Sequence, residues 1–457
     1  MSNGNESGGR REAAHRARGV MRQAVLGAVL FCALNIGAAA QADDGASTNS
    51  PAAGLARCSP ADPFRIQLAV QALRERQERV SRKAIRYLWD ERMDPQTGRI
   101  GAVQTRYLQA LCYLALVADG SDSNPRYSAR LEKVIASLRE PLAPLEGSSE
   151  TGAKLFLGTS RESLSFETHA VIALACEQLA ASDLGDSSLN ELFFRGAESA
   201  IAYIMDYRKR GRNYESAGGW PINAAPYNQS RPDRRCTAWQ LLLLKTHSYL
   251  GGRVDSTAME EAPGFVLAAQ RLPPERTPSV EEAEKTSREW MPRIRRGESA
   301  PEPVRDMLNE YWEYKRRMEE VGGFGIDTLG ITSPGATAVG LFVQGLFDAD
   351  EDRRHLAAQA FARMPLAWDS QRFFLNQFFA ARGLWMYSQR FKTMDFANYM
   401  NRLLTLMEQK QDEDGSFPMG SMGVEELNLM ERVYTTAMCV LIVNANRGNL
   451  VFDRIAP

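Results

Sequence analysis

The segment Thr237-Ala-Trp-Gln-Leu-Leu-Leu decides how this chain folds, because altered copies of it recur along most of the sequence. Several copies are apolar nearly all round for two or more helical turns, which is typical of a helix covered on every side. The repetition therefore predicts six buried helices. The other five copies start close to Thr105, Thr168, Thr337, Asn376 and Thr436.

Between these buried segments lie stretches with a single apolar stripe. The clearest runs from Thr393 to Glu408, where apolar residues recur at intervals of three and four. A fully buried helical set that alternates with a one-sided set is what two concentric rings of helices require. We therefore expect an all-α fold, a double ring of inner and outer helices.

The interval between Thr237 and Thr337 is longer than the other intervals, which indicates an insertion at about residues 274–320. It is rich in charged residues, and Ser279 and Glu282 have the spacing of a helix capping box. We expect a charged helical insertion, either a solvated flap, a lid or a docking site for a protein partner.

The amino end has the pattern of an export signal. An apolar run from Ala24 to Leu34 follows Arg22, and small residues precede a cleavage site after Ala42. Residues 1–42 are therefore expected to be a signal peptide, with Met1 or Met21 as the start, residues 43–65 a disordered linker, and residues 66–457 the folded domain. This predicts a periplasmic or secreted protein with no transmembrane segment after cleavage.

Composition excludes several classes of function. Lys and Arg number 55 against 56 Asp and Glu, so no net charge favours nucleic acid as a partner. Four of the cysteines, Cys112, Cys176, Cys236 and Cys439, lie in or beside apolar segments, and we expect them to be buried free thiols. No phosphate loop, dinucleotide fingerprint, HExxH or Gly-x-Ser-x-Gly is present, so we expect neither a cofactor nor a metal.

Glycine turns precede the buried segments, as in Gln411-Asp-Glu-Asp-Gly-Ser-Phe and Gly218-Gly-Trp-Pro. Glycine permits the positive φ of a tight turn, and the aromatic residue that follows fills the gap between helices. This set resembles the Gln-x-x-x-Gly-x-Trp repeat of the squalene–hopene cyclase and protein prenyltransferase superfamily. It is most similar to the exported bacterial prenyltransferase/squalene oxidase repeat proteins, and the resemblance implies an (α/α)6 toroid over about residues 66–457.

The resemblance implies that the toroid binds an apolar or isoprenoid molecule in a central cavity. Its cyclase motif, Asp-x-Asp-Asp-Thr-Ala, is matched best by Asp233-Arg-Arg-Cys-Thr-Ala, in which Arg235 and Cys236 replace two acids. A fixed positive charge opposes formation of a carbocation, so cyclase activity is disfavoured. Glu167 stands in the register of the third acid one repeat earlier, and Glu167 and Asp233 are the candidate catalytic residues. The sequence leaves open whether the protein is an enzyme.

Protein prenyltransferases hold zinc with Asp, Cys and His, and the residues comparable here are Asp233, Cys236 and His169, without the family's spacing. We expect no metal there, but a ligand-binding role for Arg235, Cys236 and His169. Aromatic side chains complete the candidate ligand site. They are Trp220, Tyr227, Trp239, Phe324, Phe374 and Phe378.

Two other functions stay open. The first is a polysaccharide hydrolase or lyase, which would pair two carboxylates across a cleft, chosen from Glu167, Asp233, Glu215, Asp327 and Glu431. The second is a non-catalytic scaffold or partner-binding protein. An apolar aromatic hollow at the ring centre would favour a lipid-like ligand, paired acids a sugar, and a filled centre a scaffold.

Overall fold

The computed structural model describes residues 62–100, 106–146, 153–157, 165–182, 186–210, 218–223, 232–325, 332–368, 373–418 and 425–455. The expected signal peptide and the first nineteen residues of the expected linker lie outside them, as do Tyr227, Glu215 and Asp327. The first described helix begins at Pro63, within the last residues assigned to the linker. The prediction of an all-α fold is confirmed, since the described strands are only the two-residue β1 (Trp220–Pro221) and β2 (Pro232–Asp233).

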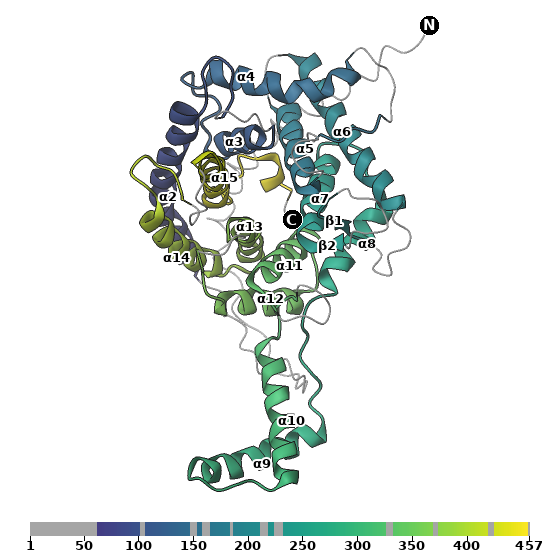
Figure 1. The fold of residues 1–457 in the computed structure, drawn as a ribbon, viewed down its shortest axis with the longest axis vertical. Coiled ribbons are helices and arrows are strands. Elements are labelled where there is room, and N and C mark those ends of the chain that lie inside the picture. The colour runs from purple at the N-terminus through teal and green to yellow at the C-terminus, as the bar shows by residue number, and fades with distance from the viewer. Residues whose placement is uncertain are drawn as a thin grey trace, which may run out of the picture. The chain divides into compact units, whose positions relative to one another are not determined.

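Six helices carry the repeated apolar segments, and we call them the central helices. They are buried almost all round because nearly every position along their middle turns is apolar. Each contacts the next along the chain, and the last contacts the first, so the order of contacts closes (Figure 1). The central helices are α3 (Arg106–Asp119), α5 (Phe166–Ala181), α7 (Arg234–Tyr249), α11 (Pro334–Leu346), α13 (Phe373–Phe391) and α15 (Glu425–Val443).

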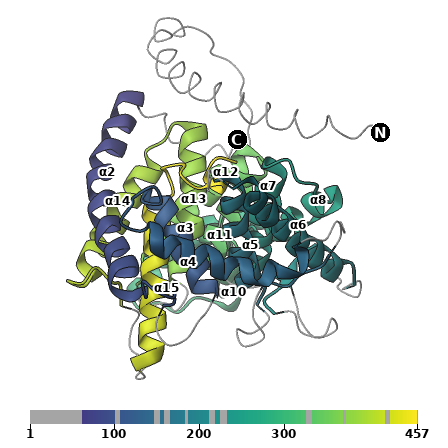
Figure 2. The ribbon, with the colours of Figure 1, turned by 90° about the horizontal axis from the view of Figure 1, so that it is seen from above.

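Outside the insertion, each of the remaining α-helices packs one face on a central helix. In α14 that face is the predicted stripe, from Phe396 to Met407, and all six stripe residues are buried. Figure 2 shows α2, α14 and α15 side by side, which brings the first and last described helices together. These peripheral helices are α2 (Pro63–Arg86, continued by the π-helical turn Tyr87–Arg92), α4 (Ser128–Arg139), α6 (Ser187–Arg210), α8 (Ser256–Leu267), α12 (Glu351–Arg363) and α14 (Asp395–Lys410).

The glycine turns that precede α7, α11 and α15 share one repeated hydrogen bond. The backbone N–H of the aromatic residue in the turn donates to the hydroxyl of a threonine in the central helix that follows, at 3.0 Å in each case. This bond satisfies an amide that the turn would otherwise bury without a partner. The three pairs are Trp220 with Thr237, Phe324 with Thr337, and Phe417 with Thr436.

The predicted insertion forms two helices, α9 (Pro278–Arg295) and α10 (Glu302–Glu319), that pack chiefly on each other and stand apart from the other helices in Figure 1. Thr277, not Ser279, caps α9, and Ser279 instead bonds to Glu310 of α10, so the expected capping box is wrong. Backbone bonds between Arg271 and the glycines Gly322 and Gly323 hold the two ends of the insertion together.

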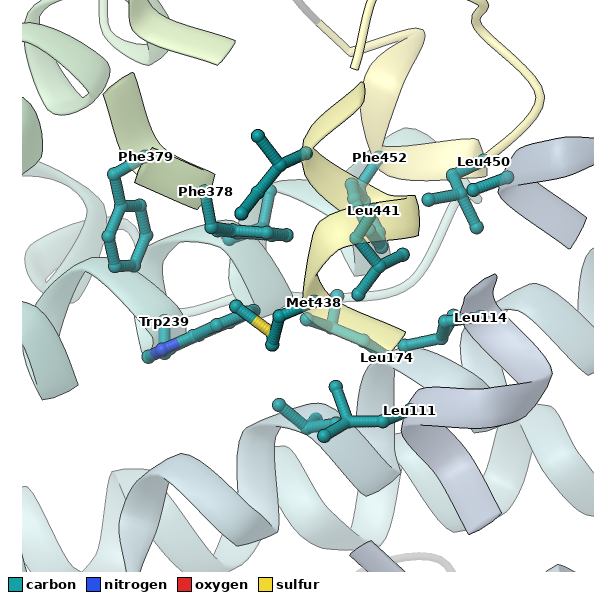
Figure 3. Packing of buried hydrophobic residues seen from close by; sticks show 14 of the residues in the cluster. Leu111, Leu114, Leu174, Trp239, Phe378, Phe379, Met438, Leu441, Leu450 and Phe452 are labelled. Carbon is teal, nitrogen blue, oxygen red and sulfur yellow. The ribbon is translucent and has the colours of Figure 1, made fainter. Parts of the chain in front are cut away.

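The space enclosed by the central helices is packed with apolar side chains, as Figure 3 shows. Trp239 stacks on Phe378 at a ring distance of 4.5 Å. After α15 the chain turns back, and the short helix η4 (Val451–Asp453) contacts α5 and α7, so that Phe452 joins this packing. Within the described residues, no helix is long and apolar enough to span a bilayer.

Candidate functional site

Polar side chains from three central helices meet near the starts of α3 and α5. Glu167 lies in the first turn of α5, and the Tyr107 hydroxyl donates a hydrogen bond to Glu167 Oε1 at 3.0 Å. Tyr434 of α15 stacks against Tyr107 with ring centroids 6.2 Å apart. We call Tyr107, Glu167 and Tyr434 the Glu167 cluster. It gathers one carboxyl group and two phenols from segments far apart in the sequence.

The surroundings of the Glu167 cluster favour neutral forms of its groups. Burial raises the pKa of Glu167 and outweighs the opposing effects of the Tyr107 hydrogen bond and the Arg235 charge. Burial also raises the pKa of Tyr107 well above its usual range, so this phenol stays a hydrogen-bond donor. A carboxyl group that keeps its proton to higher pH can donate a hydrogen bond, or the proton itself, to a bound molecule.

Asp233, the second candidate catalytic acid, caps helix α7. Its Oδ1 accepts hydrogen bonds from the backbone N–H groups of Arg235 (2.9 Å) and Cys236 (3.0 Å), and its Oδ2 lies 3.4 Å from Arg235 Nη2. These contacts satisfy amides that the helix start leaves without partners. Asp233 is near enough to raise the pKa of Glu167, so the structure brings the two predicted acids together. Its oxygens, however, are already engaged by α7.

Cys236 is buried beside these acids, and the predicted free thiols are confirmed for the four cysteines that the structure describes. Burial raises the pKa of Cys236 well above its usual range, and the charges of Asp233 and Glu167 raise it further. A thiol in this setting is neutral, whereas a nucleophile or metal ligand must be a thiolate. In the described part of the chain, no three His, Cys, Asp or Glu side chains are grouped as a metal site.

His169, predicted as a ligand contact, is fully buried and holds the backbone of its neighbours. Its Nδ1 accepts a hydrogen bond from the Leu157 amide at 3.1 Å, and its Nε2 lies 3.1 Å from the carbonyl oxygen of Ala200. Burial lowers the pKa of His169 to about 4, so the ring is neutral and Nε2 carries the hydrogen. With both nitrogens bonded to backbone groups, the ring anchors residues 153–157 to α5 and α6.

The aromatic residues predicted to contact a ligand lie in three different regions of the structure. Trp220 and Phe324 fill glycine turns, and the Trp220 indole donates to the carbonyl oxygen of Ile204 at 3.0 Å. Trp239 and Phe378 lie in the packed centre, away from the turns (Figure 3). Phe374 packs edge-on against Trp368 near the start of α13. The structure therefore does not gather these aromatic residues into one lining.

Two buried pairs of titratable side chains were not predicted from the sequence. His247 Nδ1 lies 2.6 Å from Glu177 Oε1, with both side chains fully buried between α5 and α7. Arg382 Nε lies 2.9 Å from Asp453 Oδ1, and the guanidinium stacks on Phe378 and Phe452. The available signal was a charged residue inside an otherwise apolar helix, which requires a buried partner. Sequence spacing cannot name that partner, because it lies 70 or more residues away.

The site is thus a carboxyl group bonded to one phenol, which stacks on a second, flanked by a capped helix start with its arginine and a neutral thiol. This arrangement can donate hydrogen bonds and, through Glu167, a proton. It contains no activated nucleophile among the residues described. The chain matches no protein-family model, and no curated protein matches it either.

Proposed function

We propose that residues 66–457 form an (α/α)6 toroid of the squalene–hopene cyclase and prenyltransferase type, exported to the periplasm or beyond. The closed order of contacts among the six central helices supports the toroid, as does the alternation of central and peripheral helices. The repeated bond between aromatic and threonine gives the glycine turns of the family repeat a physical role here. The apolar run and cleavage pattern before Asp43 support export.

The proposed function is binding of an apolar or isoprenoid molecule that carries one polar group, with that group at Glu167. The observation that carries the proposal is the partly buried Glu167 carboxyl, bonded to Tyr107 and held toward its protonated form. A neutral acid beside aromatic rings can bond a ligand oxygen while the rings cover apolar carbon. The positive charge of Arg235 near Glu167 favours binding over carbocation chemistry.

The packed centre limits where such a ligand can lie. Trp239, Phe378 and Phe452 occupy the space that a deep central cavity would need. We therefore place the ligand at the starts of the central helices rather than through the ring. A filled centre also favours the second candidate function, a scaffold that binds a partner through α9 and α10. Asp233 caps α7 and is not free to act as one of two catalytic carboxylates, so a sugar hydrolase is the least supported of the three candidate functions.

The test is mass spectrometry of organic extracts from protein purified out of its native host. We expect a hydrophobic compound to copurify with the wild type and to fall at least ten-fold in Glu167→Leu, because the leucine side chain can neither donate a hydrogen bond to the ligand nor accept one from Tyr107. Glu132→Leu on the exposed face of α4 is the matched control and should retain the compound. Circular dichroism verifies that both variants fold. Wild-type extracts that contain nothing above the background would favour the scaffold.

A further inference from the structure

A surface pocket of about 430 Å³ lies where the last turns of α2 meet the end of α3 and the segment after α15. Its lining includes Arg82 and Arg86 of α2, Asp119 at the end of α3, and Arg447. Helix α3 separates it from the Glu167 cluster, because Tyr107 lies in the first turn of that helix and Asp119 ends it. The pocket is therefore independent of the proposed ligand site.

Two of its arginines form no ion pair within the described residues. Arg82 and Arg86 are four residues apart on α2, so they project from the same face, and both are exposed. No ion pair or hydrogen bond is made by either side chain within the part of the chain that is described. Like charges at this spacing destabilise a helix by a few tenths of a kcal/mol, and a bound anion would reverse that effect.

Arg447 adds donors that are already withdrawn from solvent. Its side chain is only 13% exposed, and its Nη1 donates to the carbonyl oxygen of Asp119 at 3.3 Å. Its buried Nε and Nη2 atoms have no hydrogen-bond acceptor in the described structure, since Glu78 Oε1 is 3.6 Å from Nη2. Buried guanidinium nitrogens without an acceptor cost free energy, and an anion in the pocket can supply the acceptor.

Two acidic residues line the pocket against four arginines, so the lining has an excess of positive charge, and contacts elsewhere already engage both acids. Both carboxylate oxygens of Asp119 accept hydroxyl hydrogen bonds, from Ser81 and from Ser121. Glu78 contacts Arg74 as well as Arg447, at 3.7 and 3.6 Å. Burial lowers the pKa of Arg447, as expected for a cation that lacks full compensation. Arg82, Arg86 and two nitrogens of Arg447 thus remain available to a ligand.

We propose that this pocket binds a phosphate group, carried by a small phosphomonoester or by a lipid headgroup. Four arginines line the pocket, and Arg126 is paired with Asp90. The guanidinium groups of the other three match a compact dianion with three terminal oxygens, because each planar guanidinium can bond two of them. Asn124 and Ser121 line the same pocket and add neutral polar groups. The pocket volume is that of a small-molecule site. The balanced charge of the whole chain conceals this local excess.

Isothermal titration with inorganic phosphate and with phenyl phosphate, at an ionic strength fixed by sodium chloride, tests the proposal. We expect the double variant Arg82→Gln/Arg86→Gln to weaken binding at least ten-fold. Arg65→Gln, at the other end of α2 and outside the pocket, should bind like the wild type. Sedimentation with phosphatidic acid vesicles, against phosphatidylcholine vesicles, distinguishes the sources of the phosphate.

Binding of the soluble phosphates supports a phosphomonoester, and binding of phosphatidic acid vesicles alone supports a headgroup. In either case the double variant must lose the binding that Arg65→Gln keeps. The proposal is overturned if the wild type binds none of the three probes, or if the double variant binds them as the wild type does. Because the Glu167 variants leave this pocket intact, failure here and failure of the proposed function are separate results.

Discussion

At the scale of single residues, the turn glycines combine a positive φ with close contact to a neighbouring helix. Gly322 has φ of +86°, and a Cβ built there would overlap the carbonyl oxygen of Leu356 in α12. The equivalent glycines Gly218 and Gly415 lie against backbone carbonyls of α8 and α2 in the same way. The positive φ and the close approach of a neighbouring helix are two separate demands, and only glycine meets both.

Gly322→Ala should therefore cost more than the backbone conformation alone explains. We expect a loss of more than about 3 kcal/mol in the free energy of unfolding, since overpacking against a backbone atom adds about 1–3 kcal/mol to the penalty for positive φ. Gly251→Ala is the control, because Gly251 has φ of +88° and no atom lies within 4 Å of the place where a Cβ would stand. That variant should lose only about 1–2 kcal/mol. Equal losses in urea unfolding would show that the contact with α12 is unimportant.

Some residues of the Glu167 cluster and its surroundings could be predicted from the sequence, and others could not. Glu167, Asp233 and Cys236 could be named because each stands at a fixed place in the repeat, and the structure does bring these three together. Tyr107 and Tyr434 could not be named, since they lie in helices at opposite ends of the sequence. His169 was named for its place in the repeat, but its ring is bonded to backbone that the repeat does not describe.

At the scale of elements, the insertion is the part of the fold least tied to the rest. Its two helices are linked by the hydrogen bond from Ser279 to Glu310, and α9 carries surface ion pairs such as Arg276 with Glu284. Surface ion pairs of this kind contribute little to stability. The exposed Trp312 of α10 is one of the large apolar side chains at the described surface, which suits the proposed partner-binding role.

Replacing residues 273–320 by a Gly-Gly turn should leave the rest of the domain folded. The two backbone bonds between Arg271 and Gly322–Gly323 already hold the new chain ends together, so the turn closes a preformed gap. We expect the melting temperature to change by less than about 4 °C, corresponding to under about 1 kcal/mol. Differential scanning calorimetry measures this, with the full chain as reference. A large fall would show that α9 and α10 stabilise the central helices.

At the scale of the whole molecule, the end of the chain completes the packing that the central helices begin. Asp453 is buried against Arg382 of α13, and its neighbour Phe452 packs among Phe378 and its surroundings. Burial raises the pKa of Asp453 to about 6 from an ordinary 3.8, although Arg382 opposes the shift. The free-energy cost of desolvating the Asp453 carboxylate thus exceeds the stabilisation that Arg382 provides.

The raised pKa of Asp453 makes the free energy of unfolding depend on pH. Between about pH 4 and pH 6 the folded protein holds a proton on Asp453 that the unfolded chain has released, so stability falls as pH rises through this window. Asp453→Asn cannot titrate and should flatten that part of the profile by about 3 kcal/mol. Urea unfolding of both proteins at pH 4 and pH 7 measures the difference. Glu167 and Glu177 contribute equally to both, and parallel profiles would contradict the assignment.

The sequence by itself determined the helices and their order. A helix with apolar residues on every face must be buried, and a helix with a single apolar stripe packs one face. Glycine before an aromatic residue predicts a turn. Each of these patterns can be read from residues close together in the sequence. Only the tertiary structure decided that the centre is filled, that Glu177 meets His247, and that four arginines share a pocket. Such contacts join residues tens to hundreds of positions apart, and no local pattern encodes which of many buried partners comes within bonding distance.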